Sequence, residues 1–154
     1  MAGRTLVIGY GNRLRGDDGL GLAVADVVSD WHLPDVEVRT MHQLVPELAE
    51  VIATTQRVLF IDAAIPDSDR RGFTIGRVTA GRYRPILGHH ETPENLLALV
   101  HALEGNGPDA WLLSITASSF GPGDALTQNA ECNMREAIEW IRFWLTEHPC
   151  MKSA

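Results

Sequence analysis

Few cysteines and no long apolar run mark this chain of 154 residues. Only Cys132 and Cys150 are present, and without a C-x-x-C pair they predict neither a disulfide framework nor a zinc site. We expect Cys132 to be a small buried helix residue and Cys150 a free thiol near the terminus. No stretch approaches the roughly 20 apolar residues of a membrane span, and the first residues lack a signal peptide. We therefore expect a cytoplasmic protein with no membrane partner.

Positive charge is scarce as well. The formal net charge is −7, and the arginines are scattered along the chain rather than gathered in one segment. Because nucleic-acid binding requires a basic face, this balance excludes a nucleic-acid partner. Hydrophobic residues make up 45% of the chain, which is ordinary for a globular protein. The length predicts one domain over residues 1–154, and a monomer is favoured.

Short β-rich runs alternate with helical patterns, which is typical of a parallel sheet covered by helices on both faces. We expect strands over residues 5–10, 36–41, 57–62, 74–79 and 111–116. Helices are expected between the first two strands, over about 46–53, from Thr92-Pro93 to the glycines after residue 104, and near the C-terminus. Trp140 and Trp144 fall on one face of the last helix, where burial is the common explanation.

The most informative segment is the glycine-rich turn over residues 9–21, which follows the first apolar strand. Such turns occur at the carboxyl ends of strands, where α/β sheets usually bind ligands. A nucleotide-binding loop fits poorly, because the third glycine of G-x-G-x-x-G falls at Leu14. Asp17 and Asp18 would also repel a pyrophosphate at this position. The turn is better suited to a cation or to acid-base chemistry.

Three groups are candidates for that chemistry, and each has a structural alternative. One of Asp17 and Asp18 is expected to cap the following helix, which leaves the other without a structural role. Asp62 ends an apolar strand and should emerge at the same edge of the sheet, although it could simply cap the next turn. The third group is a histidine in the surface excursion over residues 80–91.

His89 and His90 precede the Thr92-Pro93 helix start, and adjacent side chains of an extended chain point in opposite directions. One of the two is therefore expected to face the site, whereas an isolated surface histidine is most often only solvated. His32, His42, His101 and His148 have no comparable context. Two carboxylates and an imidazole, from three separate loops, would suit a divalent transition metal with open coordination positions. The H-E-x-x-H motif of zinc proteases is absent.

The motif G-x-G-N-x-L-x-x-D-D-G-x-G over residues 9–21 resembles that of the hydrogenase maturation endopeptidases. Weaker similarities are Asp62-Ala63 after an apolar strand, a histidine ahead of a Pro-started helix, and the segment over residues 114–126. The resemblance extends over nearly the whole chain. It implies a phosphorylase/hydrolase-like α/β fold, a three-layer αβα sandwich with a mostly parallel, twisted, five-stranded sheet.

The resemblance also implies an activity, namely removal of a C-terminal extension from the large-subunit precursor of a nickel-iron hydrogenase after nickel insertion. The partner would be that precursor, which carries the nickel. The metal-contacting and catalytic positions carry over to Asp18, Asp62 and His89, with His90 as the alternative to His89. Either the metal activates the scissile carbonyl or water, or Asp17 or Asp62 activates water in an aspartic-protease manner.

Two other functions use the same residues differently. A noncatalytic nickel-binding checkpoint protein would recognise the loaded precursor without cutting it. A small nucleotide-binding protein would bind NAD or ATP. The glycine spacing and the adjacent acids Asp17 and Asp18 argue against this function.

Overall fold

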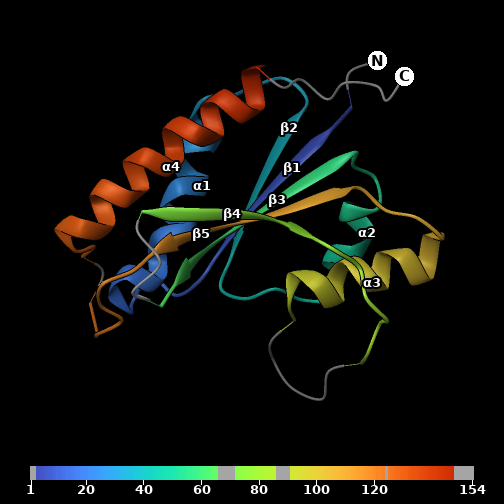
Figure 1. Ribbon diagram of the computed structural model, residues 1–154, viewed down its shortest axis with the longest axis horizontal. Coiled ribbons are helices and arrows are strands. Elements are labelled where there is room, and N and C mark those ends of the chain that lie inside the picture. Colours follow the sequence, from blue (N-terminus) through green and yellow to red (C-terminus); the bar gives the residue numbers. More distant parts are fainter. Residues whose placement is uncertain (1–2, 66–71, 86–90, 124, 148–154) are drawn as a thin grey trace.

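A twisted sheet of five strands forms the centre of the computed structural model, which describes residues 3–65, 72–85, 91–123 and 125–147 (Figure 1). The strand order is β2-β1-β3-β5-β4. The parallel strands are β1 (Thr5–Tyr10), β2 (Val36–Met41), β3 (Arg57–Ala64) and β5 (Asp109–Thr116). The edge strand β4 (Phe73–Val78) pairs antiparallel with β5. All five predicted strands are therefore confirmed, and the sheet is mostly parallel.

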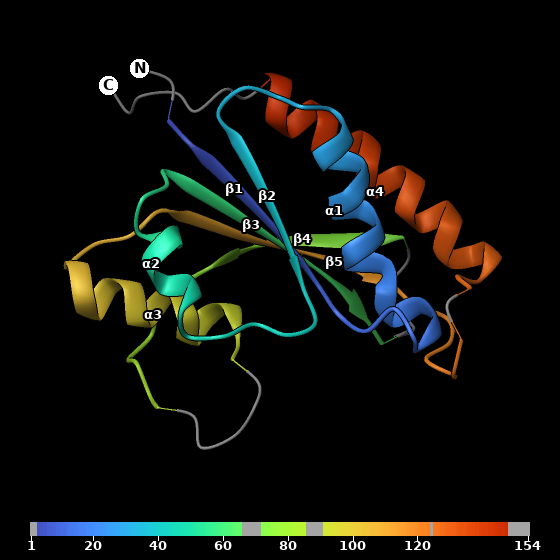
Figure 2. The ribbon, with the colours of Figure 1, turned by 180° about the vertical axis from the view of Figure 1, so that it is seen from behind.

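Helices cover both faces of the sheet, as Figures 1 and 2 show from opposite sides. On one face lie α1 (Leu20–Asp30) and α4 (Gln128–Glu147). On the other lie α2 (Leu48–Ile52) and α3 (Pro93–Glu104). A short 3-10 helix, η1 (Gly16–Gly19), joins β1 to α1. The three-layer α/β architecture expected from the alternating pattern is confirmed.

The sheet core is apolar on both sides, which explains the nearly continuous hydrophobic strands. Alternate residues such as Leu59 and Ile61 pack toward α1 and α4, whereas Val58 and Phe60 pack toward α2 and α3. All four of these side chains are fully buried. The central strand β3 is thus held from both faces, and its carboxyl end is positioned with little freedom.

Two strands differ from expectation in ways that matter for the site. β3 runs two residues beyond Asp62, because Ala63 and Ala64 continue the ladder opposite Ile115 and Thr116. Asp62 therefore lies inside the strand rather than at its end. β4 is antiparallel because its connection from β3, residues 65–72, is shorter than the roughly dozen residues that a parallel crossover requires.

The start of α3 confirms its predicted capping. The hydroxyl of Thr92 accepts a hydrogen bond from the backbone N–H of Asn95 (3.1 Å), and Pro93 occupies the first turn. Gly105 ends the helix in the left-handed conformation, with φ of +81°.

The last helix confirms one prediction and contradicts another. Trp140 and Trp144 stack on one face with ring centroids 5.9 Å apart. Cys132 is exposed, so the expectation that it is buried is wrong. The reason is its position on the helix, since the buried alanines of α4, Ala130 and Ala137, lie on the opposite side. Cys150 lies outside the described residues.

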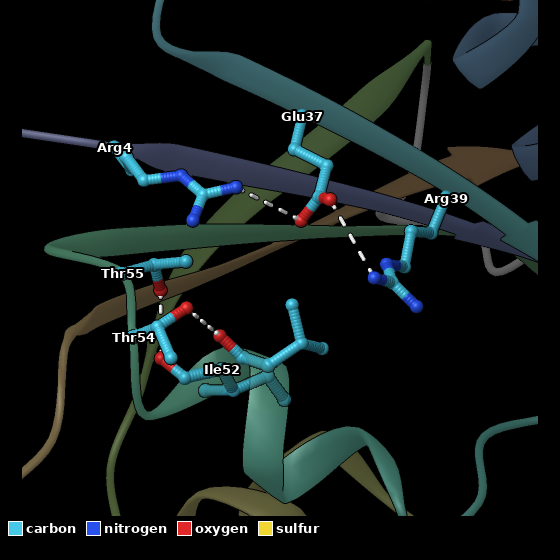
Figure 3. Close-up of polar contacts among 7 residues, drawn as sticks. Arg4, Glu37, Arg39, Ile52, Thr54 and Thr55 are labelled. Atoms are coloured by element: carbon cyan, nitrogen blue, oxygen red, sulfur yellow. Dashed lines mark hydrogen bonds and ion pairs between the residues drawn. The ribbon is translucent and has the colours of Figure 1, made fainter.

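Charged side chains protect the outer edge of the sheet at β2. The carboxylate of Glu37 lies between the guanidinium groups of Arg4 (3.7 Å) and Arg39 (3.5 Å), as Figure 3 shows. Charges of this kind discourage edge-to-edge pairing of sheets. In the same view, the hydroxyl of Thr55 donates to the carbonyl of Ile52 (2.8 Å) at the end of α2.

None of the helices in the described parts of the chain is long and apolar enough to cross a membrane.

Two glycines allow α1 to approach the sheet at the backbone level. A Cβ on Gly21 would overlap the carbonyl oxygen of Ile61 and lie 2.8 Å from that of Tyr10. A Cβ on Gly9 would lie 2.5 Å from the Cβ of Ala25. The first turn of α1 is therefore seated directly on β1 and β3, which fixes where η1 stands.

We expect Gly21→Ala to lower the free energy of unfolding by about 3 kcal/mol, because the backbone must shift to admit the methyl group. Gly76→Ala is the matched control, since a Cβ there meets no described atom within 4 Å. Urea unfolding measures both variants. Equal stability of the two would contradict the close packing of α1 on the sheet.

Candidate functional site

The candidate site lies where η1 meets the carboxyl ends of β1 and β3. Gly11 has φ of +142°, and a Cβ on it would overlap the backbone carbonyl of Asp18. Only glycine is compatible with both the torsion and the contact. The chain therefore folds back sharply after β1 and brings η1, with both of its aspartates, against the edge of the sheet.

Asp18 stabilises this turn rather than capping α1. Its Oδ2 accepts a hydrogen bond from the backbone N–H of Asn12 (2.8 Å). Its other oxygen accepts none from the described residues, and the side chain is partly exposed. The N-cap position of α1 is occupied by Gly19, so no side chain caps this helix. The predicted capping of α1 by Asp17 or Asp18 is therefore wrong.

The filled turn also argues against a nucleotide. In a phosphate-binding loop the backbone N–H groups of the turn point at the ligand. Here the N–H of Asn12 is already satisfied by a carboxylate of the same chain, a negative group where a phosphate would bind. The glycine-rich turn is thus closed by an acid and presents the remaining oxygen of Asp18 outward.

Asp17 has a different role, because its side chain is fully buried. Its Oδ2 accepts hydrogen bonds from the backbone N–H of Ser118 (2.7 Å), the N–H of Ser119 (2.9 Å) and the hydroxyl of Thr127 (2.9 Å). Its Oδ1 accepts one from the N–H of Thr127 (2.8 Å). The carboxylate joins η1 to the loop that connects β5 to α4. It is therefore a structural anchor and not an accessible base.

The hydrogen bonds of Asp17 also decide its ionisation. Burial alone would raise the pKa of Asp17, but the backbone N–H groups of Thr127, Ser118 and Ser119 and the hydroxyl of Thr127 outweigh it. The pKa of Asp17 therefore lies below its ordinary value. The group stays ionised at neutral pH.

Asp62 is held by a tyrosine from the neighbouring strand. The phenol of Tyr10 donates a hydrogen bond to Oδ2 of Asp62 (2.9 Å). Burial, followed by the charge of Asp62 and this hydrogen bond, raises the pKa of Tyr10 well above its ordinary value. Tyr10 therefore remains a hydrogen-bond donor at any physiological pH and orients the Asp62 carboxylate.

These two residues belong to a polar row that crosses the sheet. Ile8, Phe60 and Leu112 pack together on the α2 and α3 face. Two residues further along each strand, Tyr10, Asp62 and Ser114 occupy the same face. This face of the sheet thus changes from apolar to polar over two positions of each strand, near the carboxyl ends of the parallel strands.

Two open clefts meet at Asp18. The first, of about 340 Å³, is called the polar cleft because most of the residues that border it are polar; they are Tyr10, Gly11, Asn12, Arg15, Asp18, His42, Gln43 and Glu91. The second, of about 460 Å³, is bordered by the residues Arg15, Asp18, Ala63, Ile65 and Phe120. Asp62 is not among the residues that border either cleft, although its hydrogen-bond partner Tyr10 borders the first and its chain neighbour Ala63 borders the second. A molecule bound at Asp18 therefore has room on two sides.

The sequence-predicted site residues are thus partly brought together. Asp18 and Asp62 lie at the same edge of the sheet, whereas His89 and His90 lie outside the described residues. Glu91, which follows them in the chain, borders the polar cleft. Within the described ranges, no group of three or more histidine, cysteine or acidic side chains is arranged to hold a metal ion. The donor set that the structure does describe consists of two carboxylates, which suits a divalent cation only with further ligands.

Sequence reasoning missed several residues of this site. The hydrogen bond from Tyr10 to Asp62 depends on the pairing of β1 with β3, which their distance in the sequence conceals. The partners of Asp17 lie more than 100 residues away in the chain. His42 borders the polar cleft, although nothing near it in the sequence indicated this position.

No protein-family model matches the chain, and no curated protein matches it in sequence. Solved structures do resemble it. The hydrogenase maturating endopeptidase HybD from E. coli is 21% identical, with a TM-score of 0.74 over 94% of this chain and 93% of that chain. The hydrogenase maturation protease HycI from Thermococcus kodakarensis is 21% identical, with a TM-score of 0.71 over 90% and 89%.

A hydrogenase 2 maturation peptidase from a Thaumarchaeota archaeon is 22% identical, with a TM-score of 0.67 over 93% of this chain and 98% of that chain. At these identities the likeness establishes the fold. The resemblance that the glycine-rich motif indicated is therefore confirmed at the level of the fold, and over nearly the whole length of each chain.

We expect Asp17→Asn to lower the free energy of unfolding by about 3 kcal/mol, because the amide presents N–H groups to donors that need an acceptor. The matched control is Asp26→Asn, which removes an exposed ion pair with Arg13 (2.6 Å) and should change stability by less than about 1 kcal/mol. Urea unfolding compares the two. A small effect at Asp17 would show that the anchor is dispensable.

The same carboxylate predicts a pH dependence. The pKa of Asp17 is lower in the folded than in the unfolded chain. Its contribution to the free energy of unfolding is therefore complete above the pKa of the unfolded chain, and it is lost as pH falls below about 4. The stability gap between wild type and Asp17→Asn should therefore narrow in acid. A gap that stays constant between neutral and acidic pH would contradict the shift.

Proposed function

We propose that this chain is a hydrogenase maturation endopeptidase, which removes the C-terminal extension from a nickel-loaded large-subunit precursor. The observation that carries the proposal is the position of Asp18 and Asp62 at one edge of the sheet, in a fold shared with three hydrogenase maturation proteases. The precursor is the partner, and we propose the cytoplasm as the site of action.

The nickel belongs to the substrate in this proposal. Asp18, Asp62 and His89 would contact it, and the orientation of the two carboxylates supports this role. Asp18 is held through one oxygen by Asn12, and Asp62 is oriented through one oxygen by Tyr10. Carboxylate and imidazole are suitable ligands for a divalent transition ion, which would polarise the scissile carbonyl or a water molecule.

The carboxylates would also move the proton that peptide hydrolysis requires. A general base takes a proton from the attacking water, and the same proton can then pass to the departing amine. Asp62 is the favoured base, since its carboxylate is oriented by the hydrogen bond from Tyr10, which borders the first cleft. Asp17 is excluded from this role because it is buried and accepts four hydrogen bonds.

An in vitro processing assay tests the proposal directly. Purified chain is incubated with large-subunit precursor, with and without nickel, and the product is followed by mass spectrometry. We expect loss of the C-terminal extension from the loaded precursor only. Binding of loaded precursor without shortening would instead identify a noncatalytic checkpoint protein, and no interaction with either form would overturn both functions.

Variants of the site then test the residues. We expect Asp62→Asn to reduce processing by at least about 100-fold, as loss of a general base does, and to leave the unfolding curve nearly unchanged. Asp109→Asn is the matched control, because Asp109 begins the adjacent strand β5 and its side chain forms, among the residues that the structure describes, only an exposed ion pair with Arg77 (2.8 Å). Processing by Asp62→Asn at the wild-type rate would remove Asp62 from the mechanism.

The two histidines are compared in the same assay. We expect His89→Ala to abolish processing of loaded precursor and His90→Ala to retain it, since His89 is the proposed contact to the nickel. The opposite result would move the ligand to His90. Full activity of both single variants and of the double variant would exclude a histidine ligand from this segment.

A further inference from the structure

Arg15 occupies an unusual position between the two clefts at Asp18. It borders both of them, and the two acidic residues that border them are Asp18 and Glu91. Its guanidinium forms no ion pair within the described parts of the chain, although Arg13, two residues earlier, pairs with Asp26 at 2.6 Å. Among the described residues, this exposed cation near a candidate catalytic carboxylate has no acidic partner, and its charge suits an anionic group from outside.

The backbone that carries Arg15 is held firmly. Its N–H donates to the carbonyl of Asn12 (3.1 Å), and its carbonyl accepts from the N–H of Asp18 (3.1 Å). Gly123 also binds the chain on both sides of Arg15. Its N–H donates to the carbonyl of Leu14 (2.9 Å), and its carbonyl accepts from the N–H of Gly16 (2.8 Å). The base of the Arg15 side chain is therefore fixed relative to Asp18, as a substrate-binding cation requires.

The second cleft provides an apolar surface next to this cation. Ile65, which directly follows β3, is 74% exposed, and Phe120 lies partly exposed on the loop after β5. The volume of about 460 Å³ accommodates several peptide atoms, and the cleft is continuous with Asp18. Such a surface next to a guanidinium is complementary to a peptide that carries an apolar side chain and a carboxylate.

We propose that Arg15 and the apolar cleft at Ile65 and Phe120 form a specificity subsite for the substrate peptide. The cleft binds an apolar side chain, and Arg15 pairs with a carboxylate within a few residues of it. The inference rests on the proposed peptidase function and deepens it. The carboxylate comes either from the C-terminus of the extension or from an acidic side chain, and Arg15 is a substrate-binding residue.

Peptide binding tests the subsite without cleavage. The intact 15N-labelled protein is titrated with acetyl-Ala-Leu-Ala-Ala as a free acid, with its C-terminal amide, and with acetyl-Ala-Leu-Glu-Ala amide. We expect the free acid to shift the amide signals of Ile65 and Phe120 and to bind about fivefold more tightly than the neutral amide. If the glutamate peptide binds as tightly as the free acid, a side-chain carboxylate is sufficient for the pairing with Arg15. If it binds no more tightly than the neutral amide, Arg15 recognises the terminal carboxylate.

Matched variants assign the effect to the subsite. Arg15→Gln should remove the preference for the free acid, whereas Arg13→Gln should keep it. Ile65→Ser should weaken binding of all leucine peptides, whereas Leu14→Ser should not, although Leu14 is 70% exposed and close in sequence to Arg15. Equal affinity for neutral and acidic peptides, or equal effects of the two arginine variants, would overturn the proposal.

Processing of the precursor separates this inference from the proposed function. Arg15→Gln should raise KM by about fivefold with kcat nearly unchanged, as expected for loss of a uniform binding contact. Unchanged kcat/KM would overturn the subsite and leave the peptidase intact. Peptide binding at the cleft by a wild-type chain that cleaves no precursor would instead overturn the peptidase and leave the binding surface.

Discussion

The buried carboxylate of Asp17 is the interaction on which the arrangement of the site depends. It collects four hydrogen bonds from the loop between β5 and α4, and so ties the first turn of the chain to its last quarter. A buried charge is tolerated only when it is satisfied in this way. Because Asp18 and Arg15 lie on the same short segment, their positions follow from this anchor. The structural acid Asp17 and the candidate site acid Asp18 are therefore adjacent in sequence, but the first is buried and the second is partly exposed.

The second constraint is the register of the central strands. The pairing of Gly9 with Ile61 places the phenol of Tyr10 over Asp62, so that a long side chain from β1 orients a short one from β3. Burial keeps Tyr10 protonated, which makes the contact a constant donor to the carboxylate. Meanwhile the glycines at positions 9 and 21 let α1 sit directly on these strands. The close packing of α1 and the orientation of Asp62 by Tyr10 thus both determine the structure of this part of the sheet edge.

The electrostatics of this edge are divided rather than uniformly negative. Asp18 and Asp62 offer oxygens suited to a cation, whereas Arg15 lies at the junction of the two clefts without an ion pair among the described residues. The proposed substrate, which carries both a metal and a carboxylate, would interact with both parts. The apolar surface at Ile65 lies next to these charges, and ligand pockets commonly combine an apolar lining with a few polar groups.

By itself, the sequence determined the α/β architecture, the places of the strands, the capping of α3 at Thr92 and the glycine-rich turn. These features depend on local periodicity and on the conformational limits of proline and glycine, which act over a few residues. Only the tertiary structure decided that Asp17 is an anchor, that β4 is antiparallel and that Tyr10 orients Asp62. Those features are contacts between segments far apart in the chain. No local pattern specifies which distant amide will satisfy a buried carboxylate, because that choice is made by the packing of the whole sheet and its helices.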